Sequence, residues 1–383
     1  MQSKATSTMR KGVVALTTAG LLGAALTTAS AAGAPPVPAL RKSLDSLVSQ
    51  EKFPAALASV TTAGRTTSLV AGSSRLGSQV PVPRDGRVRA GSNTKTFVAT
   101  VVLQLVAEGQ VGLDTPIEQY LPGLVRGEGI DATKITVRQL LQHTSGLPNY
   151  TEYLGLENFA ALQHRFFQPH DLLAAALAHP AKFAPGARWE YSNTNYLLAG
   201  LLIEHVTGRP VQEQITDRVI KKAGLRDTYW PQPGDQTIQG PHPHGYATGD
   251  TTGAVVDATE LDPSWGGAAG QLISTPGDLA KVDRALLDGT LLPPAQLAEM
   301  RKTVDAPIMP GWQYGLGLFR VPLSCGGVYW GHGGDIPGFE TRGGATEDGR
   351  SVGLAVTALP GTFGDAEKGA KAVLSTVDTA FCG

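Results

Sequence analysis

The feature that most constrains the fold is a helix that the rest of the chain must enclose. Residues 94–108 carry apolar side chains at helical spacing over a wide stripe, at Phe97, Val98, Val101, Val102, Leu105 and Val106. A stripe this wide requires a largely buried helix. The 383 residues, 42% hydrophobic and 17% charged, supply enough apolar surface for such a core, which excludes intrinsic disorder.

The charges exclude one class of partner. The 32 Lys and Arg residues are balanced by 33 Asp and Glu residues, and no basic block is present. Affinity for nucleic acid depends on positive charge placed against phosphates, so we expect no nucleic-acid partner. His242 and His244 are a possible metal pair without a recognisable third ligand, so neither a metal nor another cofactor is predicted.

Residues 1–31 differ from the rest and predict a secretory signal peptide. Lys and Arg residues start the segment, residues 12–28 are uncharged and mostly small or apolar, and residues 29–31 supply a small-residue cleavage pattern. We therefore expect a secreted, extracellular protein. The alternative is a retained membrane anchor, but Gly, Ala and Thr make a weak one, so no stable anchor is expected.

The order of the predicted elements favours two lobes. About 350 residues follow the signal, more than one hydrophobic core usually serves. We expect residues 32–90 and 301–383 to form an antiparallel sheet flanked by the terminal helices, and residues 91–300 to form a mostly helical inserted lobe, in an α/β (α+β) fold. The elements expected at the two ends are helices at 39–50 and 365–381 and strands at 55–62, 67–71, 327–330, 341–345 and 351–358.

Cys325 and Cys382 are the only cysteines, and both belong to the part expected to be exported. In an oxidising compartment an even count predicts one disulfide, which would tie the C-terminal segment to the body. Two free buried thiols are the alternative.

Ser92 and Lys95 are the best candidates for chemistry. Ser92 precedes the apolar helix, where the positive end of the helix dipole favours a developing oxyanion. Lys95 follows three residues later on the same face, so its amine can reach the serine hydroxyl. Taken alone, the pair is more typical of a helix-capping serine beside a snorkelling lysine than of a catalytic pair.

Two further motifs change that interpretation. Tyr191-Ser192-Asn193 precedes a new helix, and His332-Gly333-Gly334 follows a predicted strand. The order Ser-x-x-Lys, Tyr-x-Asn, His-x-Gly resembles the three-motif pattern of the penicillin-recognising serine hydrolases. Within that family, the chain resembles the secreted D-alanyl-D-alanine carboxypeptidases of the class C β-lactamase-like group, through residues 104–109, 120–124, 143–147, 191–195 and 323–326.

The resemblance implies roles for the catalytic residues and an active site between the two lobes. Ser92 would be the acylated nucleophile, Lys95 its activating partner and Tyr191 the proton relay to the leaving group. His332 would stand where many relatives have lysine. Peptidoglycan-type D-peptides would be substrates, and β-lactams would acylate the serine.

The resemblance also implies a substrate-binding set. Asn193 would hold the substrate amide, Trp265 would line the pocket, and the amides of Ser92 and Asp335 would form the oxyanion hole. The His-containing motif departs from the carboxypeptidases, because Gly333, Gly334 and Asp335 replace residues whose hydroxyls help to bind the substrate carboxylate.

An arginine that clamps the same carboxylate is replaced by Phe319, and the adjacent Arg320 is expected to face the other side of the strand. Asp335 would repel a carboxylate. We therefore hypothesise that substrates with a neutral end, or with a free amine able to pair with Asp335, are favoured. The alternative is that the Asp335 side chain points to solvent and only its N–H matters.

These features predict a secreted serine hydrolase that acts through an acyl-enzyme and is D-alanyl-D-alanine carboxypeptidase-like. An esterase or a β-lactamase would share the acylation machinery, and a non-catalytic penicillin-binding or cell-wall-binding module would share the fold. His143 and Ser145 are too close in sequence to face each other and are expected to form a helix-terminating turn.

Overall fold

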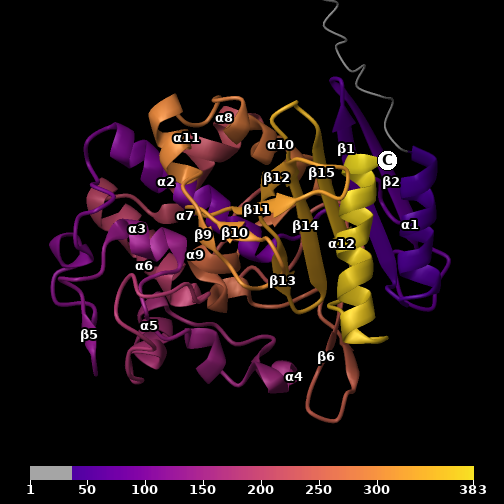
Figure 1. The fold of residues 1–383 in the computed structure, drawn as a ribbon. Helices are drawn as coiled ribbons and strands as arrows, with labels where there is room; N and C mark the ends of the chain where they lie inside the picture. The colour runs from indigo at the N-terminus through magenta and orange to yellow at the C-terminus, as the bar shows by residue number, and fades with distance from the viewer. Residues whose placement is uncertain (1–36) are drawn as a thin grey trace, which may run out of the picture. The chain divides into compact units, whose positions relative to one another are not determined.

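Strands from both ends of the chain build one antiparallel sheet (Figure 1), as predicted. The computed structural model describes residues 37–383, and the predicted signal peptide lies outside them. The sheet runs β2-β1-β15-β14-β12-β11-β10-β9, and β13 pairs with β14. The strands are β1 Ala55–Thr62, β2 Arg65–Gly72, β9 Val304–Asp305, β10 Gln313–Tyr314, β11 Phe319–Pro322, β12 Val328–Gly331, β13 Gly334–Ile336, β14 Phe339–Ala345 and β15 Ser351–Val356.

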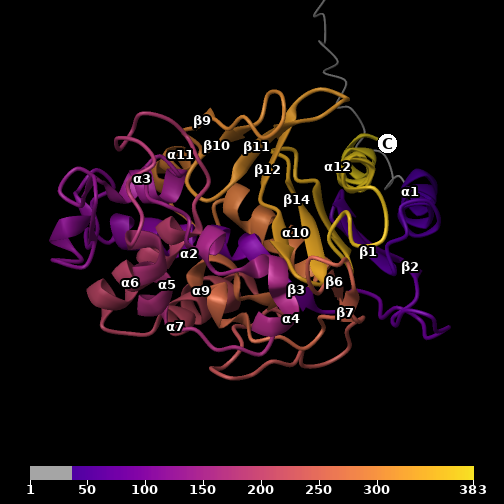
Figure 2. The same cartoon turned by 90° about the horizontal axis from the view of Figure 1, so that it is seen from below.

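Helices cover both faces of this sheet (Figure 2). The terminal helices α1 (Val37–Ser49) and α12 (Ala366–Cys382) pack together against one face, and α10 (Pro276–Leu287) packs against the other. Successive strand residues face opposite ways, so Val352 and Leu354 of β15 join the core under α12, whereas Ala355 joins the core that includes α10. Both faces of β15 are therefore apolar.

The helix α2 (Thr94–Ala107) is enclosed, as its wide apolar stripe predicts. Helices α6, α7, α9 and α11 contact it. The helices between the two parts of the sheet, besides α2 and α10, are α3 Val137–Gln142, α4 Phe159–Leu162, α5 Pro169–Leu177, α6 Asn193–Thr207, α7 Val211–Ile215, α8 Lys221–Ala223, α9 Gly267–Gly270 and α11 Pro294–Met300. Residues 91–300, which were expected to form the helical lobe, therefore also include α10, a helix that packs against the sheet.

Short two-stranded ladders complete the structure. They pair β3 Val88–Arg89 with β8 Ile273–Ser274, β4 Arg126–Gly127 with β5 Ile130–Asp131, and β6 Tyr246–Thr248 with β7 Val255–Asp257. A disulfide joins Cys325 to Cys382, 57 residues apart, and ties the end of α12 to the turn between β11 and β12.

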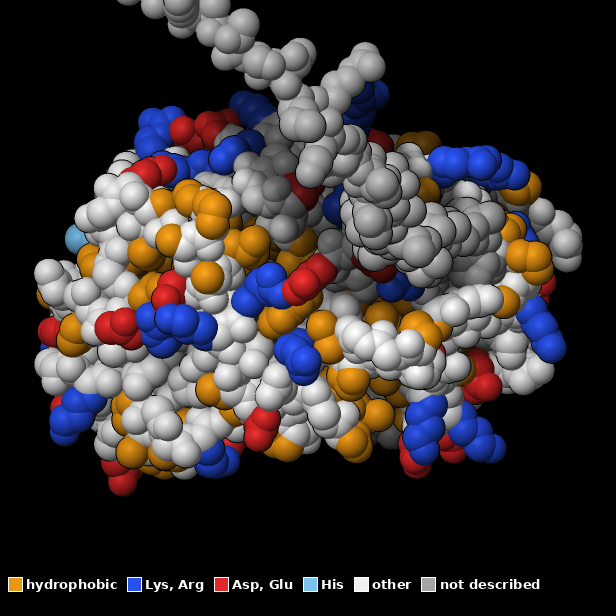
Figure 3. Space-filling model, turned by 45° about the horizontal axis from the view of Figure 1, so that its top comes forward, with side chains coloured by type: hydrophobic (Ala, Val, Ile, Leu, Met, Phe, Trp, Pro, Cys, Tyr) orange, Lys and Arg blue, Asp and Glu red, His pale blue; other side chains and the backbone are white. Residues whose placement is uncertain are grey.

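The surface carries mixed charge. On the face drawn in Figure 3, Lys and Arg side chains lie beside Asp and Glu side chains, and the described residues form no continuous basic area there. Within residues 37–383, none of the helices has the length and apolar character that a membrane crossing requires.

Candidate active site

Ser92 lies in a 3₁₀ turn, Gly91–Asn93, that leads directly into α2. Gly91 has φ +51°, in the left-handed region that glycine adopts without strain. A Cβ at Gly91 would come 3.0 Å from the amide nitrogen of Asp335, so β13 lies against the turn and the amides of Ser92 and Asp335 are neighbours. Two backbone N–H groups beside a helix N-terminus can serve as an oxyanion hole.

Lys95 is fully buried, and its Nζ has three polar neighbours. It lies 2.9 Å from Ser92 Oγ, 2.8 Å from Asn193 Oδ1 and 2.7 Å from the carbonyl oxygen of Ala269. Burial lowers the pKa of Lys95 well below 10.5, although the negative charge of Asp335 acts to raise it. A neutral amine donates two N–H groups, here to Asn193 and Ala269, and its lone pair can accept the serine proton.

Tyr191 lies beside the nucleophile. Its ring centroid lies 4.8 Å from Lys95 Nζ, and its side chain lines the same cavity as Ser92. Burial raises the pKa of Tyr191 well above 10, so the side chain is a protonated phenol. The site therefore places a base with a lowered pKa in contact with the serine hydroxyl and a phenolic proton donor in the same cavity.

His332 follows β12 and is held as one neutral tautomer. Its Nδ1–H donates to the carbonyl oxygen of Gly333 at 2.6 Å, and its Nε2 accepts from the Tyr314 hydroxyl at 3.1 Å. Burial, as the main cause, lowers the pKa of His332 to about 3. This imidazole therefore supplies hydrogen bonds and no positive charge.

Asn193 is the first residue of α6 and fixes the amine. Its Oδ1 accepts from Lys95, its Nδ2 donates to Thr151 Oγ1 at 3.3 Å, and its own N–H donates to Asn149 Oδ1 at 3.0 Å. The structure thus places the predicted serine, tyrosine, asparagine and histidine around one cavity, with the lysine in contact with the serine and the asparagine.

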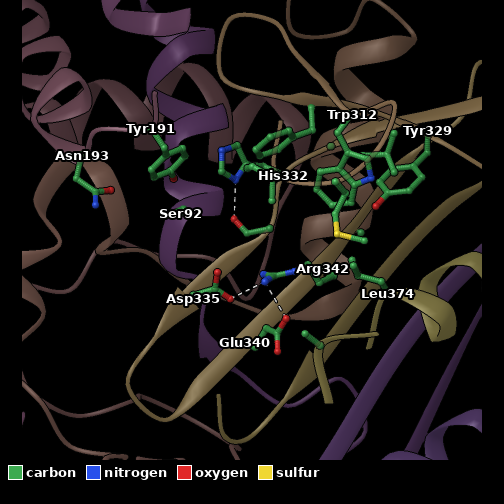
Figure 4. A pocket seen from close by; sticks show the side chains of 18 residues that line it. Ser92, Tyr191, Asn193, Trp312, Tyr329, His332, Asp335, Glu340, Arg342 and Leu374 are labelled. Atoms are coloured by element: carbon green, nitrogen blue, oxygen red, sulfur yellow. Dashed lines mark hydrogen bonds and ion pairs between the residues drawn. The ribbon is translucent and has the colours of Figure 1, made fainter. Parts of the chain in front are cut away.

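The cavity has a volume of about 430 Å³ (Figure 4). Apolar side chains dominate it, and its charged lining residues are Asp335, Glu340 and Arg342. The full lining is Ser92, Tyr191, Asn193, Ile308, Met309, Trp312, Phe319, Val321, Tyr329, Gly331, His332, Gly333, Asp335, Glu340, Arg342, Gly343, Ala370 and Leu374.

Two predicted substrate-binding residues do not reach this cavity. Trp265 lies in the helical core, where its carbonyl oxygen accepts from the Tyr150 hydroxyl at 2.7 Å. Gly334 is buried against the turn before Ser92, where a Cβ would come 1.9 Å from the carbonyl oxygen of Ala90. Phe319 lines the cavity, whereas Arg320 turns away and donates to Gln313 Oε1 at 3.3 Å.

Arg342 is the site residue that sequence reasoning missed. Its Nη2 lies 2.8 Å from Asp335 Oδ1 and 2.8 Å from Glu340 Oε1. The hypothesis of an uncompensated charge on Asp335 needs this correction, because its carboxylate is ion-paired although its side chain is 57% exposed. The alternation of Glu340 and Arg342 on β14 signals a shared face, but not which strand lies beside it.

His143 was predicted to belong to a turn, and it does end α3 in a left-handed conformation, with φ +62°. Tertiary packing also places its ring 4.2 Å from the ring of Tyr191. Its Nδ1 accepts from the backbone N–H of Ser192 and from Asn195 Nδ2. Ser145 donates to Asn195 Oδ1, so the two residues do not form a Ser/His catalytic pair.

This fold and this site together define a class of enzyme. A nucleophile and a neutral amine at the start of a buried helix, beside an antiparallel sheet made from both chain ends, are the arrangement of a penicillin-recognising serine hydrolase. The family model described as Beta-lactamase matches residues 40–378. The chain belongs to this family.

Similar proteins include hydrolases with solved structures. The chain is 41% identical to a D-stereospecific amidohydrolase from Streptomyces sp., with a TM-score of 0.80, covering 88% of this chain and 98% of that one. It is 28% identical to a D-amino acid amidase from Ochrobactrum anthropi SV3, with a TM-score of 0.79, covering 90% of this chain and 97% of that one.

One curated relative is PbpX of Bacillus subtilis (strain 168), named as a penicillin-binding protein. It is 28% identical over 265 residues, which are 68% of this chain. The chain spans 59% of the length of that relative.

Proposed function

We propose that this protein hydrolyses amides of D-amino acids through an acyl-enzyme on Ser92. The fully buried amine of Lys95, held between Ser92, Asn193 and Ala269, is the observation that carries the acyl-enzyme proposal. The similarity to a D-stereospecific amidohydrolase and to a D-amino acid amidase supports the choice of D-amino-acid amides.

The charges of the cavity favour an amide over a free acid. A carboxypeptidase needs a cation for the terminal carboxylate of its substrate. Among the described residues, the one cation lining the cavity is Arg342, which is already paired with Asp335 and Glu340. This supports a preference for amides over the free C-terminal acid of a D-alanyl-D-alanine carboxypeptidase substrate.

The reaction then proceeds in two halves. Ser92 Oγ attacks the carbonyl carbon while its proton passes to Lys95 Nζ, and the amides of Ser92 and Asp335 hold the oxyanion. Tyr191 donates its proton to the leaving nitrogen as the C–N bond breaks, and Lys95 reprotonates Tyr191. Water then adds to the ester carbonyl and its proton passes through Tyr191 and Lys95 to Ser92 Oγ as the acyl C–Oγ bond breaks, which releases the free D-amino acid and restores the serine.

The test compares D- and L-phenylalaninamide, with ammonia release as the readout. Wild-type protein should hydrolyse the D-isomer preferentially, and Ser92→Ala should abolish hydrolysis. Intact-mass analysis after exposure to a β-lactam should show an adduct on the wild type and none on Ser92→Ala. Ester or β-lactam turnover without amide hydrolysis would overturn the proposal in favour of an esterase or a β-lactamase. A persistent adduct with no turnover of any substrate would indicate a binding module.

We also propose that residues 1–31 direct secretion and are then removed. The charged start, the uncharged stretch and the small-residue cleavage pattern support this. N-terminal sequencing of protein recovered outside cells that express the full chain should begin near residue 32. Protein that stays inside the cells, or that keeps the segment, would contradict export.

A further inference from the structure

The cavity that starts at Ser92 continues beyond the catalytic residues as far as α12. Aromatic rings form an unbroken series along it, because the ring centroids of Tyr191 and His332 lie 6.3 Å apart and those of His332 and Phe319 lie 5.1 Å apart. Trp312 follows, with its ring centroid 5.4 Å from that of Phe319. Figure 4 shows His332 between Tyr191 and Trp312. We call the apolar part beyond His332 the distal chamber; it is lined by Ile308, Met309, Trp312, Phe319, Val321, Tyr329, Ala370 and Leu374.

The glycines on either side of His332 add no side chain to this space. Gly331, the last residue of β12, and Gly333 both line the cavity. A Cβ at Gly333 would come 2.6 Å from Arg342 Nη1, so any larger residue would displace the guanidinium.

The distal chamber lies on the leaving-group side of the nucleophile. Tyr191, which donates a proton to the leaving nitrogen in the proposed reaction, adjoins His332, and His332 adjoins the first aromatic ring of the chamber. A group attached to the leaving nitrogen would therefore extend past His332 into the apolar part.

A buried carboxylate gives the chamber a polar feature. Glu340 is 1% exposed and lines the cavity, and its Oε1 is paired with Arg342. Its other oxygen, Oε2, is buried without a hydrogen-bond partner in the described part of the chain. A buried acceptor without a donor is costly, so a ligand N–H at this position would be stabilised.

The chamber mouth exposes apolar side chains. Ile308 is 50% exposed and Met309 is 37% exposed, in the segment between β9 and β10. A bound apolar group would remove part of this surface from water, which is favourable.

We propose that the leaving group is an amino-acid residue with a large apolar side chain, whose own carboxyl end is an amide that donates an N–H to Glu340. The preferred substrates are then peptides that begin with a D-amino acid and are cut after that residue, and they are preferred over the simple amides that release ammonia. This inference rests on the proposed function, because it assumes that Ser92 attacks the D-aminoacyl carbonyl.

The substrate test uses four compounds that share the D-phenylalanyl group. They are the primary amide D-Phe-NH2, D-Phe-Gly-NH2, D-Phe-Phe-NH2 and the free acid D-Phe-Phe-OH. We expect kcat/KM for D-Phe-Phe-NH2 to exceed that for D-Phe-Gly-NH2 and that for D-Phe-Phe-OH by about tenfold or more each. Equal values for the Gly and Phe leaving groups would overturn the chamber proposal. If none of the four compounds is hydrolysed, the result contradicts the proposed function instead.

Variants test the location. Leu374→Trp should fill the chamber from α12 and lower the ratio of kcat/KM for D-Phe-Phe-NH2 over D-Phe-NH2 by about fivefold or more. The control is Ser375→Trp, because Ser375 is the exposed neighbour on α12 and does not line the cavity. Glu340→Gln should reduce the preference for the peptide amide over the acid, because Gln can donate to a carboxylate. Unchanged ratios in Leu374→Trp and Glu340→Gln would overturn the assignment.

Discussion

The Nζ of Lys95 lies 2.9 Å from the Oγ of Ser92, at the start of the buried helix α2. At this distance Lys95 can accept the serine proton, but only when its amine is uncharged. Burial provides that condition by lowering its pKa, and acceptors on Asn193 and Ala269 orient the two N–H groups that remain.

Activity should depend on the protonation of Lys95. The neutral amine is present above the lowered pKa, so kcat/KM should fall as the pH drops through that pKa and should reach its plateau well below pH 10.5. A pH profile of D-phenylalaninamide hydrolysis measures this. His332→Gln should keep the acid limb, because the pKa of His332 is about 3. A rate that still climbs up to pH 10.5 would contradict the assignment of Lys95 as base.

Lys95→Arg should lower kcat/KM about a thousandfold, because a guanidinium cannot become neutral in the working range. The variant keeps a long nitrogen-containing side chain but carries a permanent charge, so it tests whether an uncharged amine is required. Thermal unfolding should accompany the assay to check that the variant is folded. Near wild-type activity in a folded Lys95→Arg protein would disprove the role.

Tyr191→Phe should lower kcat by about 10²- to 10⁴-fold, because the phenol that protonates the leaving nitrogen is gone. The matched control is Tyr196→Phe. Tyr196 also lies near Lys95, with its ring centroid 5.6 Å from the Nζ, but it is fully buried and its hydroxyl donates to the Leu141 carbonyl oxygen. The control should lose about 1 kcal/mol of stability and stay within a few-fold of wild-type activity. Similar losses of kcat in both variants would indicate a general packing effect.

Acid should destabilise the protein in part through His332. Its pKa is about 3 when folded against an ordinary 6.5, so the unfolded chain binds the extra proton between these values. The stability is fully present above pH 6.5 and declines as the pH falls toward 3. Burial raises the pKa of Glu340 to about 7, which acts in the opposite direction.

The difference between wild type and His332→Gln isolates the histidine. From pH 7 to pH 5, the free energy of unfolding of the wild type should fall by about 2 kcal/mol more than that of the variant, as measured by urea denaturation. Equal changes in the two proteins would show that His332 is not held neutral.

Removing the disulfide by Cys325→Ser with Cys382→Ser should lower the free energy of unfolding by about 2–4 kcal/mol, because the bond closes a 57-residue separation. Denaturation with and without reductant checks this. Reduced wild type should match the double variant, and the double variant should not respond to the reductant. A wild type that is insensitive to complete reduction would contradict a stabilising bond.

Sequence alone predicted those parts of the site that depend on local geometry. Ser92 and Lys95 meet because residues three apart on a helix share a face, and the apolar stripe of α2 indicates that this face is buried. The motif order, carried by resemblance, added Tyr191 and His332. The antiparallel sheet and its terminal helices followed from apolar runs and turn residues.

Only the tertiary structure decided what surrounds the nucleophile. Arg342 reaches the cavity because β14 pairs with β13 in a register that sets Glu340 opposite Asp335, and register depends on partners distant in the sequence. The packing of His143 on Tyr191 and of Trp265 in the helical core also depends on partners distant in the sequence. Helical spacing is a local property that one segment can encode, whereas contacts between strands and helices emerge only when the whole chain packs.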